Sequence, residues 1–250
     1  MSLKSYLVSL KQYAENKKIC DELKSYKNIH KGERCFIIGT GPSLKTEDLD
    51  KLKDEFTFSS HRIFEIFPKT EWRPTYYICQ DYPLICKFKE EIKSVEAKRK
   101  FMLIEAKHNF AEESDISYFV LRHKDFYPNN ADFSTHINRY IGQGFTVTYA
   151  AIQMAYYMGF SKVYLLGIDH NYSISLNEKG VPVMQENVKD YFEGSTASNE
   201  GINLPRVVES SMAYMTARKF ADKHNDFSVY NATRGGKLEA FERADFDKII

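Results

Sequence analysis

The sequence predicts an α/β fold with a mostly parallel sheet and helices on both faces of that sheet. From Gly32 onward, short apolar runs alternate with longer amphipathic ones, as repeated βα units do. Hydrophobic residues make up 43% of the 250 residues, which is enough to bury one substantial core. We therefore expect an N-terminal helix within residues 1–31 and one nucleotide-binding α/β domain over residues 32–250.

The N-terminal segment has the periodicity of an amphipathic helix. Its apolar residues recur at helical spacing, at Leu3, Tyr6, Leu7, Leu10, Tyr13 and Ala14. The polar face carries acids as well as lysines, so packing on the domain or on a partner chain is favoured over a membrane-surface role.

The core of the chain reads as a series of short buried strands. Apolar runs predict strands at residues 34–39, 56–60, 75–80, 100–106, 116–122, 162–168 and 227–233. Helices are expected over residues 146–160, which are small and apolar, and over residues 206–224. The polar, weakly periodic stretch from about residue 170 to 204 is typical of a lid. Together these elements predict a Rossmann-like arrangement.

Composition limits the partners and the compartment. The chain carries 35 Lys and Arg against 34 Asp and Glu, a net charge of +1, which gives no support to a nucleic-acid partner. The four cysteines lack CxxC spacing, as expected in a reducing compartment. No apolar run approaches the roughly 20 residues of a membrane span, and the N-terminus lacks a signal-peptide core. We expect a cytoplasmic protein, possible homo-oligomer formation, and at most peripheral contact with the inner membrane face.

A glycine turn follows the first predicted strand. Gly39, Thr40, Gly41, Pro42 and Ser43 lie where that strand ends and a helix-like segment begins. At the carboxyl edge of a parallel sheet, such a turn is expected to leave backbone amides unpaired for an anionic ligand group. The pattern is neither GxGxxG nor a Walker A loop, so a purely structural βα turn remains an alternative.

A second cluster of candidates surrounds the buried helix and the strand after it. Gly144, Thr146 and Thr148 lie at the predicted helix start, and the strand that follows ends in the triplet Gly167 to Asp169. Helix starts and strand ends collect at one edge of an open α/β sheet, so this cluster is expected to face the glycine turn across a crevice. Ordinary helix or turn caps are the alternative for the threonines and Asp169.

Further polar residues follow the second and third strands. Ser60, His61 and Arg62 follow one, and Gln80 and Asp81 follow the other. All could reach a ligand from the same edge, although Asp81 is more simply a cap for a helix beginning at the next residue. Metal binding has weak support, because no HxH or HExxH motif is present and a DxD occurs only at residues 245–247. We expect no metal site and no cofactor.

Three motifs resemble a known superfamily. "FIIGTGPSL", "GFTVTYAAIQMAYYMGFSKVYLLGID" and "VYNATRGGKLEAF" look like segments of the bacterial lipooligosaccharide sialyltransferases and their relatives. Those relatives include the flagellin-modifying motility accessory factors and the archaeal-type 6-hydroxymethylpterin diphosphokinase-like proteins. The resemblance covers roughly residues 34–240 and is specific mainly in these blocks.

The resemblance implies roles for the glycine turn. Gly39, Gly41, Pro42 and Ser43 match positions that wrap the CMP end of a donor in the sialyltransferases. Thr40 replaces an Asn that contacts the donor in those enzymes, so that contact is altered here.

The resemblance also suggests catalytic residues near the second cluster. Asp169 matches a residue beside the nucleotide, and Tyr172 and Tyr191 are candidates for tyrosines that donate to the leaving phosphate. The lid His that serves as base in the sialyltransferases is missing, and Glu193 and His170 are the competing replacements.

The function implied is a metal-independent, sialyltransferase-like glycosyltransferase of cell-surface polysaccharide or glycan synthesis. It would take a nucleotide-activated sugar, CMP-linked in the first instance, and a glycan acceptor. The alternatives are diphosphate transfer from ATP, as in the 6-hydroxymethylpterin diphosphokinase-like branch, and a non-catalytic nucleotide or sugar binder.

Overall fold

A computed structural model describes residues 3–111, 113–123, 131–176, 181–185, 187–195 and 205–250. Its centre is an eight-stranded sheet in which every neighbouring pair is parallel, in the order β12-β11-β8-β1-β2-β3-β4-β5. The strands are β1 (Arg34–Ile38), β2 (Phe56–Ser60), β3 (Tyr76–Cys79), β4 (Arg99–Leu103), β5 (Ile116–Phe119), β8 (Lys162–Leu166), β11 (Ser228–Asn231) and β12 (Glu242–Arg243). The predicted α/β, mostly parallel fold is confirmed.

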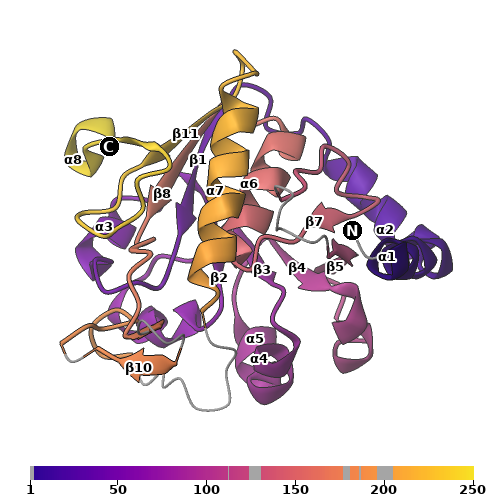
Figure 1. Cartoon of the computed structure of the whole chain (residues 1–250), viewed down its shortest axis with the longest axis horizontal. Helices are drawn as coiled ribbons and strands as arrows, with labels where there is room; N and C mark the ends of the chain where they lie inside the picture. Colours follow the sequence, from indigo (N-terminus) through magenta and orange to yellow (C-terminus); the bar gives the residue numbers. More distant parts are fainter. Residues whose placement is uncertain (1–2, 112, 124–130, 177–180, 186, 196–204) are drawn as a thin grey trace.

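The chain order creates a switch point between β1 and β8. From β1 the chain proceeds through β2 to β5 on one side, and then returns to β8 and β11 on the other side. The connections on the first side are α3 (Thr46–Asp50), η2 (Ile63–Lys69), α4 (Tyr82–Lys87), α5 (Lys89–Ser94) and η3 (Ile104–Asn109). The helices α6 (Val147–Met158) and α7 (Val207–Ala221) connect the strands of the return path and lie side by side in front of the sheet in Figure 1. Ligands of open α/β sheets bind at such switch points.

Helix α6 is a core helix. All its residues except Tyr156 are buried, and it ends at Gly159, whose φ of 91° is the left-handed value that glycine tolerates in a C-cap. Buried Gln153 uses all four of its amide bonds. Its Oε1 accepts from the amides of Ser134 and Gly142, and its Nε2 donates to the carbonyls of Gly142 and Tyr149. These bonds hold the 134–142 segment against α6.

Aromatic rings stack across three neighbouring strands of the sheet. Phe36, Tyr164 and Tyr230 are register partners on β1, β8 and β11, with centroid separations of 5.2 and 5.4 Å. Phe246 of α8 (Phe246–Ile249) packs edge-on against Phe36. Cross-strand aromatic pairs of this kind stabilise a sheet, and here they also anchor the C-terminal helix.

The N-terminal helix differs from the prediction in length and in orientation. It forms α1 (Leu3–Glu15), then α2 (Lys17–Asp21) and the 3-10 turn η1 (Glu22–Tyr26), with the break at Asn16. Leu7 and Leu10 are 52% and 44% exposed, whereas Ser9 is buried and Tyr13 packs against the core. The apolar face expected to pack inward therefore includes two exposed leucines.

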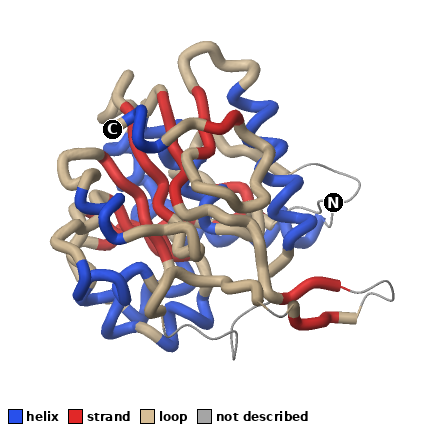
Figure 2. The backbone as a smooth tube through the Cα atoms, turned by 90° about the vertical axis from the view of Figure 1, so that its left-hand side faces the viewer, coloured by secondary structure: helices blue, strands red, loops and turns tan. Residues whose placement is uncertain are grey.

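The strand predicted over residues 116–122 is divided in two. β5 ends at Phe119, and β6 (Leu121–Arg122) pairs with β7 (Ile141–Gly142) in a separate small sheet. A hairpin of β9 (Ile174–Leu176) and β10 (Pro182–Met184) projects from the body in Figure 2. No helix within the described parts of the chain is long and apolar enough to cross a bilayer.

Candidate functional site

A cavity of about 730 Å³ opens at the carboxyl ends of β1, β2, β3 and β8. Most of the site residues predicted from the sequence line it: Gly39, Thr40, Gly41, Ser60, His61, Gln80, Thr146, Thr148, Gly167, Asp169, His170, Tyr172 and Tyr191. The glycine turn and the start of α6 thus share one cavity, as the sequence predicted. Pro42, Ser43 and Glu193 are not part of its lining.

The glycine turn does not present a free cradle of amides. The amides of Gly39 and Gly41 donate to the carbonyls of Leu166 and Gly167, at 2.8 and 3.0 Å. The amide of Ser43 donates to Asp169 Oδ2 at 3.3 Å. The expectation of unpaired amides is wrong for these three residues, because the end of β8 and the segment after it supply their acceptors.

Close packing against β8 explains why the turn contains glycines. A Cβ at Gly39 would lie 2.4 Å from the carbonyl oxygen of Gly167, and a Cβ at Gly41 would lie 2.0 Å from Asp169 Oδ2. Thr40 is the exception in this turn, since neither its amide nor its hydroxyl has a protein partner among the described residues. Its polar groups are therefore available at the cavity.

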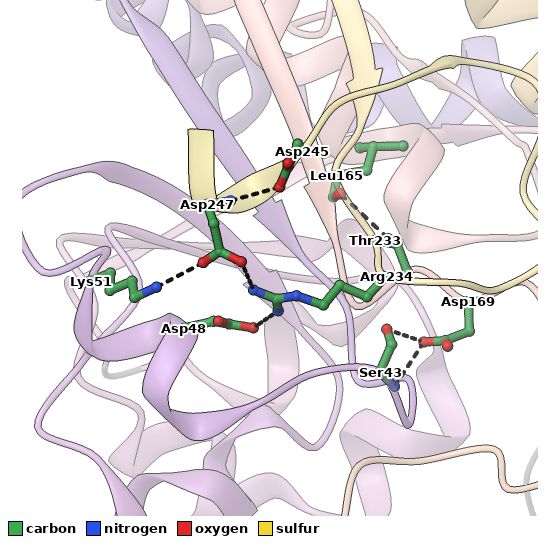
Figure 3. A network of polar contacts seen from close by, with 9 residues as sticks. All are labelled: Ser43, Asp48, Lys51, Leu165, Asp169, Thr233, Arg234, Asp245 and Asp247. Atoms are coloured by element: carbon green, nitrogen blue, oxygen red, sulfur yellow. Dashed lines mark hydrogen bonds and ion pairs between the residues drawn. The ribbon is translucent and has the colours of Figure 1, made fainter. Parts of the chain in front are cut away.

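Asp169 is held from three sides. Its Oδ2 accepts from the hydroxyl and the amide of Ser43, at 2.8 and 3.3 Å (Figure 3), and its backbone carbonyl accepts from the amide of Lys237 at 2.7 Å. The carboxylate is only 8% exposed, and burial raises its pKa, while the bonds from Ser43 oppose the rise. Both bonds from Ser43 go to Oδ2, so Oδ1 of the carboxylate can still accept a hydrogen bond from a ligand.

Strained backbone concentrates at the cavity. His61, Phe145 and His170 have φ values of 53°, 52° and 49°, and all three line it. The other described non-glycine residues with positive φ are Asn28 and Asn187, and asparagine tolerates this conformation better than most residues. Strain of this kind persists where the surrounding structure enforces it, often at ligand sites.

The start of α6 provides free donors. The amides of Val147 and Thr148 have no protein acceptor within the described residues, as is usual in the first turn of a helix. Thr146 Oγ1 lies 3.2 Å from the hydroxyl of buried Tyr214 on α7. These amides carry the positive end of the helix dipole and favour an anion.

His170 is fixed as one tautomer by α7. Ser211 Oγ donates to the carbonyl of Val207 at 2.8 Å, so its hydroxyl hydrogen is already used. His170 Nε2 lies 2.7 Å from the same oxygen and must therefore be the protonated nitrogen that donates. Nδ1 is then an acceptor; it is buried and has no protein partner in the part of the chain that the structure describes. Burial lowers the pKa of His170, which favours the neutral imidazole at pH 7.

The described part of the 170–204 segment crosses the glycine turn. The Phe192 amide donates to the Thr40 carbonyl at 2.9 Å, and Tyr172 and Tyr191 line the cavity beside it. Burial raises the pKa of both tyrosines, so their hydroxyls stay protonated donors. Glu193 is exposed, and its backbone carbonyl accepts from Lys69 Nζ at 3.0 Å. Residues 177–180, 186 and 196–204 of the predicted lid lie outside the described residues.

Several lining residues had not been selected from the sequence. They come from α4, from the ends of β4 and β6, from the segment before α6, from the chain after β8 and from α7: Tyr82, Leu84, Leu103, Leu121, His123, Gln143, Phe145, Asn171, Asp190 and Tyr214. The sequence did contain a signal for Tyr214. It is the one bulky residue on a face of the helix predicted at residues 206–224 that otherwise carries Ser and Ala. Asp81 lines the cavity but caps α4 by accepting from the Leu84 amide at 3.2 Å, as expected.

Two further observations concern metal-binding groups and arginines near the cavity. Among the described residues no group of three or more His, Cys, Asp or Glu could hold a metal ion. Arg206 lines the cavity and is ion-paired with Glu209, and its guanidinium lies 4.2 Å from the Phe145 ring centroid. Arg234, which follows β11, lies outside the cavity lining and pairs with Asp48 and Asp247 (Figure 3).

Fold and cavity together define an α/β protein with a cavity at the switch point of a parallel sheet. A family model described as "6-hydroxymethylpterin diphosphokinase MptE-like" matches residues 5–175. The match covers more than half of the chain, so the chain belongs to this family, and the superfamily resemblance is confirmed.

Two solved structures align with this chain, and the first of them shares its fold. "MAf glycosyltransferase from Magnetospirillum magneticum AMB-1" aligns with a TM-score of 0.52 and 14% identity, over 93% of this chain and 38% of that one. The chain thus spans well under half of that structure. The sialyltransferase CstII from Campylobacter jejuni, in complex with a substrate analogue, cytidine-5'-monophosphate, aligns with a TM-score of 0.44 and 14% identity over 84% of each chain. Comparison with curated proteins found no match.

Proposed function

We propose that the protein is a transferase that uses a nucleotide-activated sugar, CMP-linked in the first instance, and a glycan acceptor in cell-surface polysaccharide or glycan synthesis. The observation that supports this most is the shared cavity, in which a glycine turn, a free helix start and Asp169 converge on one space. The cavity volume of about 730 Å³ suits a nucleotide sugar, since small-molecule sites range from about 300 to 1,000 Å³. We place the protein in the cytoplasm, with at most peripheral membrane contact.

In the proposed reaction, the bond between the sugar's anomeric carbon and the phosphate oxygen breaks. The phosphate leaves with the bonding electrons, and an acceptor hydroxyl forms the new bond to the anomeric carbon. The amides of Val147 and Thr148 and the hydroxyls of Tyr172 and Tyr191 would stabilise the departing phosphate. Donors fixed in place before the reaction make such stabilisation effective. No step in this scheme requires a metal ion.

The acceptor proton needs a base, and His170 fits that role better than Glu193. His170 is a lining residue with a neutral imidazole whose acceptor, Nδ1, is buried, whereas Glu193 lies outside the lining. Ser211 would act as a positioning residue, because its hydroxyl holds the tautomer in which Nδ1 is the acceptor. Asp169 would accept hydrogen bonds from the ribose hydroxyls of the donor.

The first experiment measures thermal stabilisation by CMP, CDP, UDP, GDP and ATP. A ligand that binds only the folded protein raises the melting temperature according to its affinity. We expect CMP to give the largest shift and Asp169→Asn to reduce it. Equal indifference to all five nucleotides would count against nucleotide-dependent transfer. Hydrolysis of a CMP-sugar without acceptor, lost in Asp169→Asn, would exclude a non-catalytic binder.

The role of Ser211 can be tested through the pH dependence of kcat/KM. Ser211→Ala removes the acceptor for Nε2–H, so both tautomers become populated and the acid limb of the profile is expected to shift. Ser210→Ala is the matched control, because Ser210 is the neighbouring serine on α7 and its hydroxyl, within the described residues, bonds the carbonyls of Arg206 and Val207 and not His170. Identical profiles for the two variants would contradict a positioning role.

The family match favours a second candidate, diphosphate transfer from ATP to a hydroxymethylpterin. Phosphoryl transfer of this kind relies on Mg²⁺ bound by one or two carboxylates together with substrate phosphates. Turnover that requires ATP, Mg²⁺ and a pterin would establish this candidate. Turnover of a CMP-sugar in the presence of EDTA would support the first.

A further inference from the structure

Helix α1 turns its polar side toward the protein. Ser9 is buried, and Gln12 Nε2 donates to Glu105 Oε1 at 2.7 Å. Asn16, one residue beyond the helix, accepts through Oδ1 from Lys107 Nζ at 2.6 Å. Polar contacts with the segment after β4 therefore help to determine which side of α1 faces the body.

The opposite side of α1 is apolar and exposed. Leu7, Val8 and Leu10 are 52%, 49% and 44% exposed, and Ala14 is exposed as well. Leu7, Leu10 and Ala14 are spaced by three and four residues, so they form one apolar stripe along the helix. A helix that served only to pack on its own domain would turn this stripe inward. At the right-hand edge of the molecule in Figure 1, α1 instead presents it outward, where a partner can cover it.

Positive charge is concentrated in the same segment. Residues 1–31 hold seven lysines and three acids, whereas the rest of the chain holds 28 Lys and Arg and 31 Asp and Glu. The segment therefore carries a net charge of +4 and the rest of the chain −3. Lys11 is 76% exposed and lies four residues after Leu7, so it borders the apolar stripe. Lys17 and Lys18 follow, exposed, at the start of α2.

An apolar stripe bordered by lysines fits an anionic lipid bilayer better than it fits a second copy of this chain. Apolar side chains of such a helix enter the boundary between headgroups and acyl chains, while lysine stems extend to the headgroups. Each lysine near an anionic surface strengthens binding about fivefold. Two copies of a segment with a net charge of +4 would repel each other across a shared contact. The negative charge of the rest of the chain favours an approach with α1 foremost.

We propose that α1 docks the protein on the surface of an anionic membrane. The helix lies in the plane of the interface, with the apolar stripe toward the acyl chains and Lys11 among the headgroups. Because α1 also contacts β6, whose Leu121 lines the cavity, docking brings that end of the cavity toward the bilayer. This surface goes beyond the proposed function and does not depend on it, since no residue of α1 lines the described cavity.

Co-sedimentation with lipid vesicles tests the proposal. One set of vesicles is pure phosphatidylcholine, and the other is an equimolar mixture of phosphatidylcholine and phosphatidylglycerol. We expect at least about tenfold tighter binding to the anionic vesicles, and loss of this difference at high salt. The double variant Leu7→Gln, Leu10→Gln keeps good helix formers of similar size and removes the apolar stripe. It should bind the anionic vesicles at least about tenfold more weakly than the wild type does.

The matched control is Val208→Thr, Met215→Gln, which changes two apolar residues of α7 that are 68% and 46% exposed. It should bind within about twofold of the wild type. Equal binding of the wild type to both kinds of vesicle, or unchanged binding in the α1 variant, overturns the proposal. So does a wild-type dimer in sedimentation velocity that the α1 variant loses, without vesicle binding, because the stripe then belongs to a second copy. Thermal stabilisation by CMP should be the same in both variants, so failure to dock leaves the proposed function standing.

Discussion

Two adjacent glycines in the turn after β11 allow the packing behind Asp169 to be measured separately from backbone strain. Gly235 and Gly236 both have φ of +71°, and both carbonyls accept hydrogen bonds from Arg243. They differ in surroundings. A Cβ on Gly235 would meet nothing within 4 Å, whereas a Cβ on Gly236 would lie 2.7 Å from the Asp169 carbonyl oxygen and 2.9 Å from its Cα. Replacing each with alanine therefore adds the same strain but only one collision.

The expected magnitudes follow from this difference. Alanine in the left-handed region costs about 1–2 kcal/mol, which is the whole expected effect of Gly235→Ala. Gly236→Ala pays this cost and adds overpacking against backbone atoms, about 1–3 kcal/mol more. In a chain of 250 residues each kcal/mol lowers Tm by about 2–4 °C. The variant Gly236→Ala should thus melt at least about 2 °C below Gly235→Ala.

Urea unfolding followed by circular dichroism measures the stability of both variants, and titration with CMP measures the site. Relief of the collision would push Asp169 toward the cavity and weaken its contact with Ser43, so Gly236→Ala should also lose nucleotide affinity. Gly235→Ala should bind as the wild type does. Equal destabilisation of the two variants, or intact binding in Gly236→Ala, would refute the idea that this turn sets the position of Asp169.

Two further predictions concern ionisable groups. Arg234→Met leaves the Asp48 carboxylate, whose side chain is 4% exposed, without its ion-pair partner. Because the Arg234 side chain is itself 33% exposed, we expect the free energy of unfolding, measured with urea, to fall by about 1–3 kcal/mol. A loss of stability below about 1 kcal/mol, the range of an exposed ion pair, would contradict this prediction. Burial lowers the pKa of His61 and His170 below 6.5. The unfolded chain then binds more protons below that pH, so stability should fall as the pH drops below about 6.5, by up to about 1.4 kcal/mol per pH unit for each histidine. A urea midpoint that is constant from pH 8 to 5.5 would refute this.

The sheet could be predicted from the sequence because most of its strands are short, nearly continuous apolar runs. A parallel strand buried on both faces needs near-continuous apolar residues, and Arg34–Ile38 and Lys162–Leu166 show them. The N-terminal helix shows the limit of such reasoning. Periodicity predicts that a helix forms but not which side faces the body. That side is determined by polar partners elsewhere, such as Glu105, which accepts from Gln12, and Lys107, which donates to Asn16.

The candidate site could be located from sequence but not described in detail. Strand ends and helix starts converge on one edge by topology alone, which is why Thr146 and the glycine turn were placed together correctly. Which atoms remain free depends on contacts between distant segments. The acceptor for Gly41 lies at the end of β8, and the partner of His170 lies on α7. Neither contact leaves a pattern in the sequence.

The internal bonding of the glycine turn changes where an anion can bind. The Asp169 carboxylate already occupies the side of the turn that faces β8, through bonds from the Ser43 amide and hydroxyl (Figure 3). A phosphate placed there would meet a like charge instead of free donors. Backbone and hydroxyl donors without a protein acceptor among the described residues include the Thr40 amide and hydroxyl and the first amides of α6. A nucleotide phosphate is therefore expected between Thr40 and α6, which leaves Asp169 to contact neutral hydroxyl groups that donate to a carboxylate.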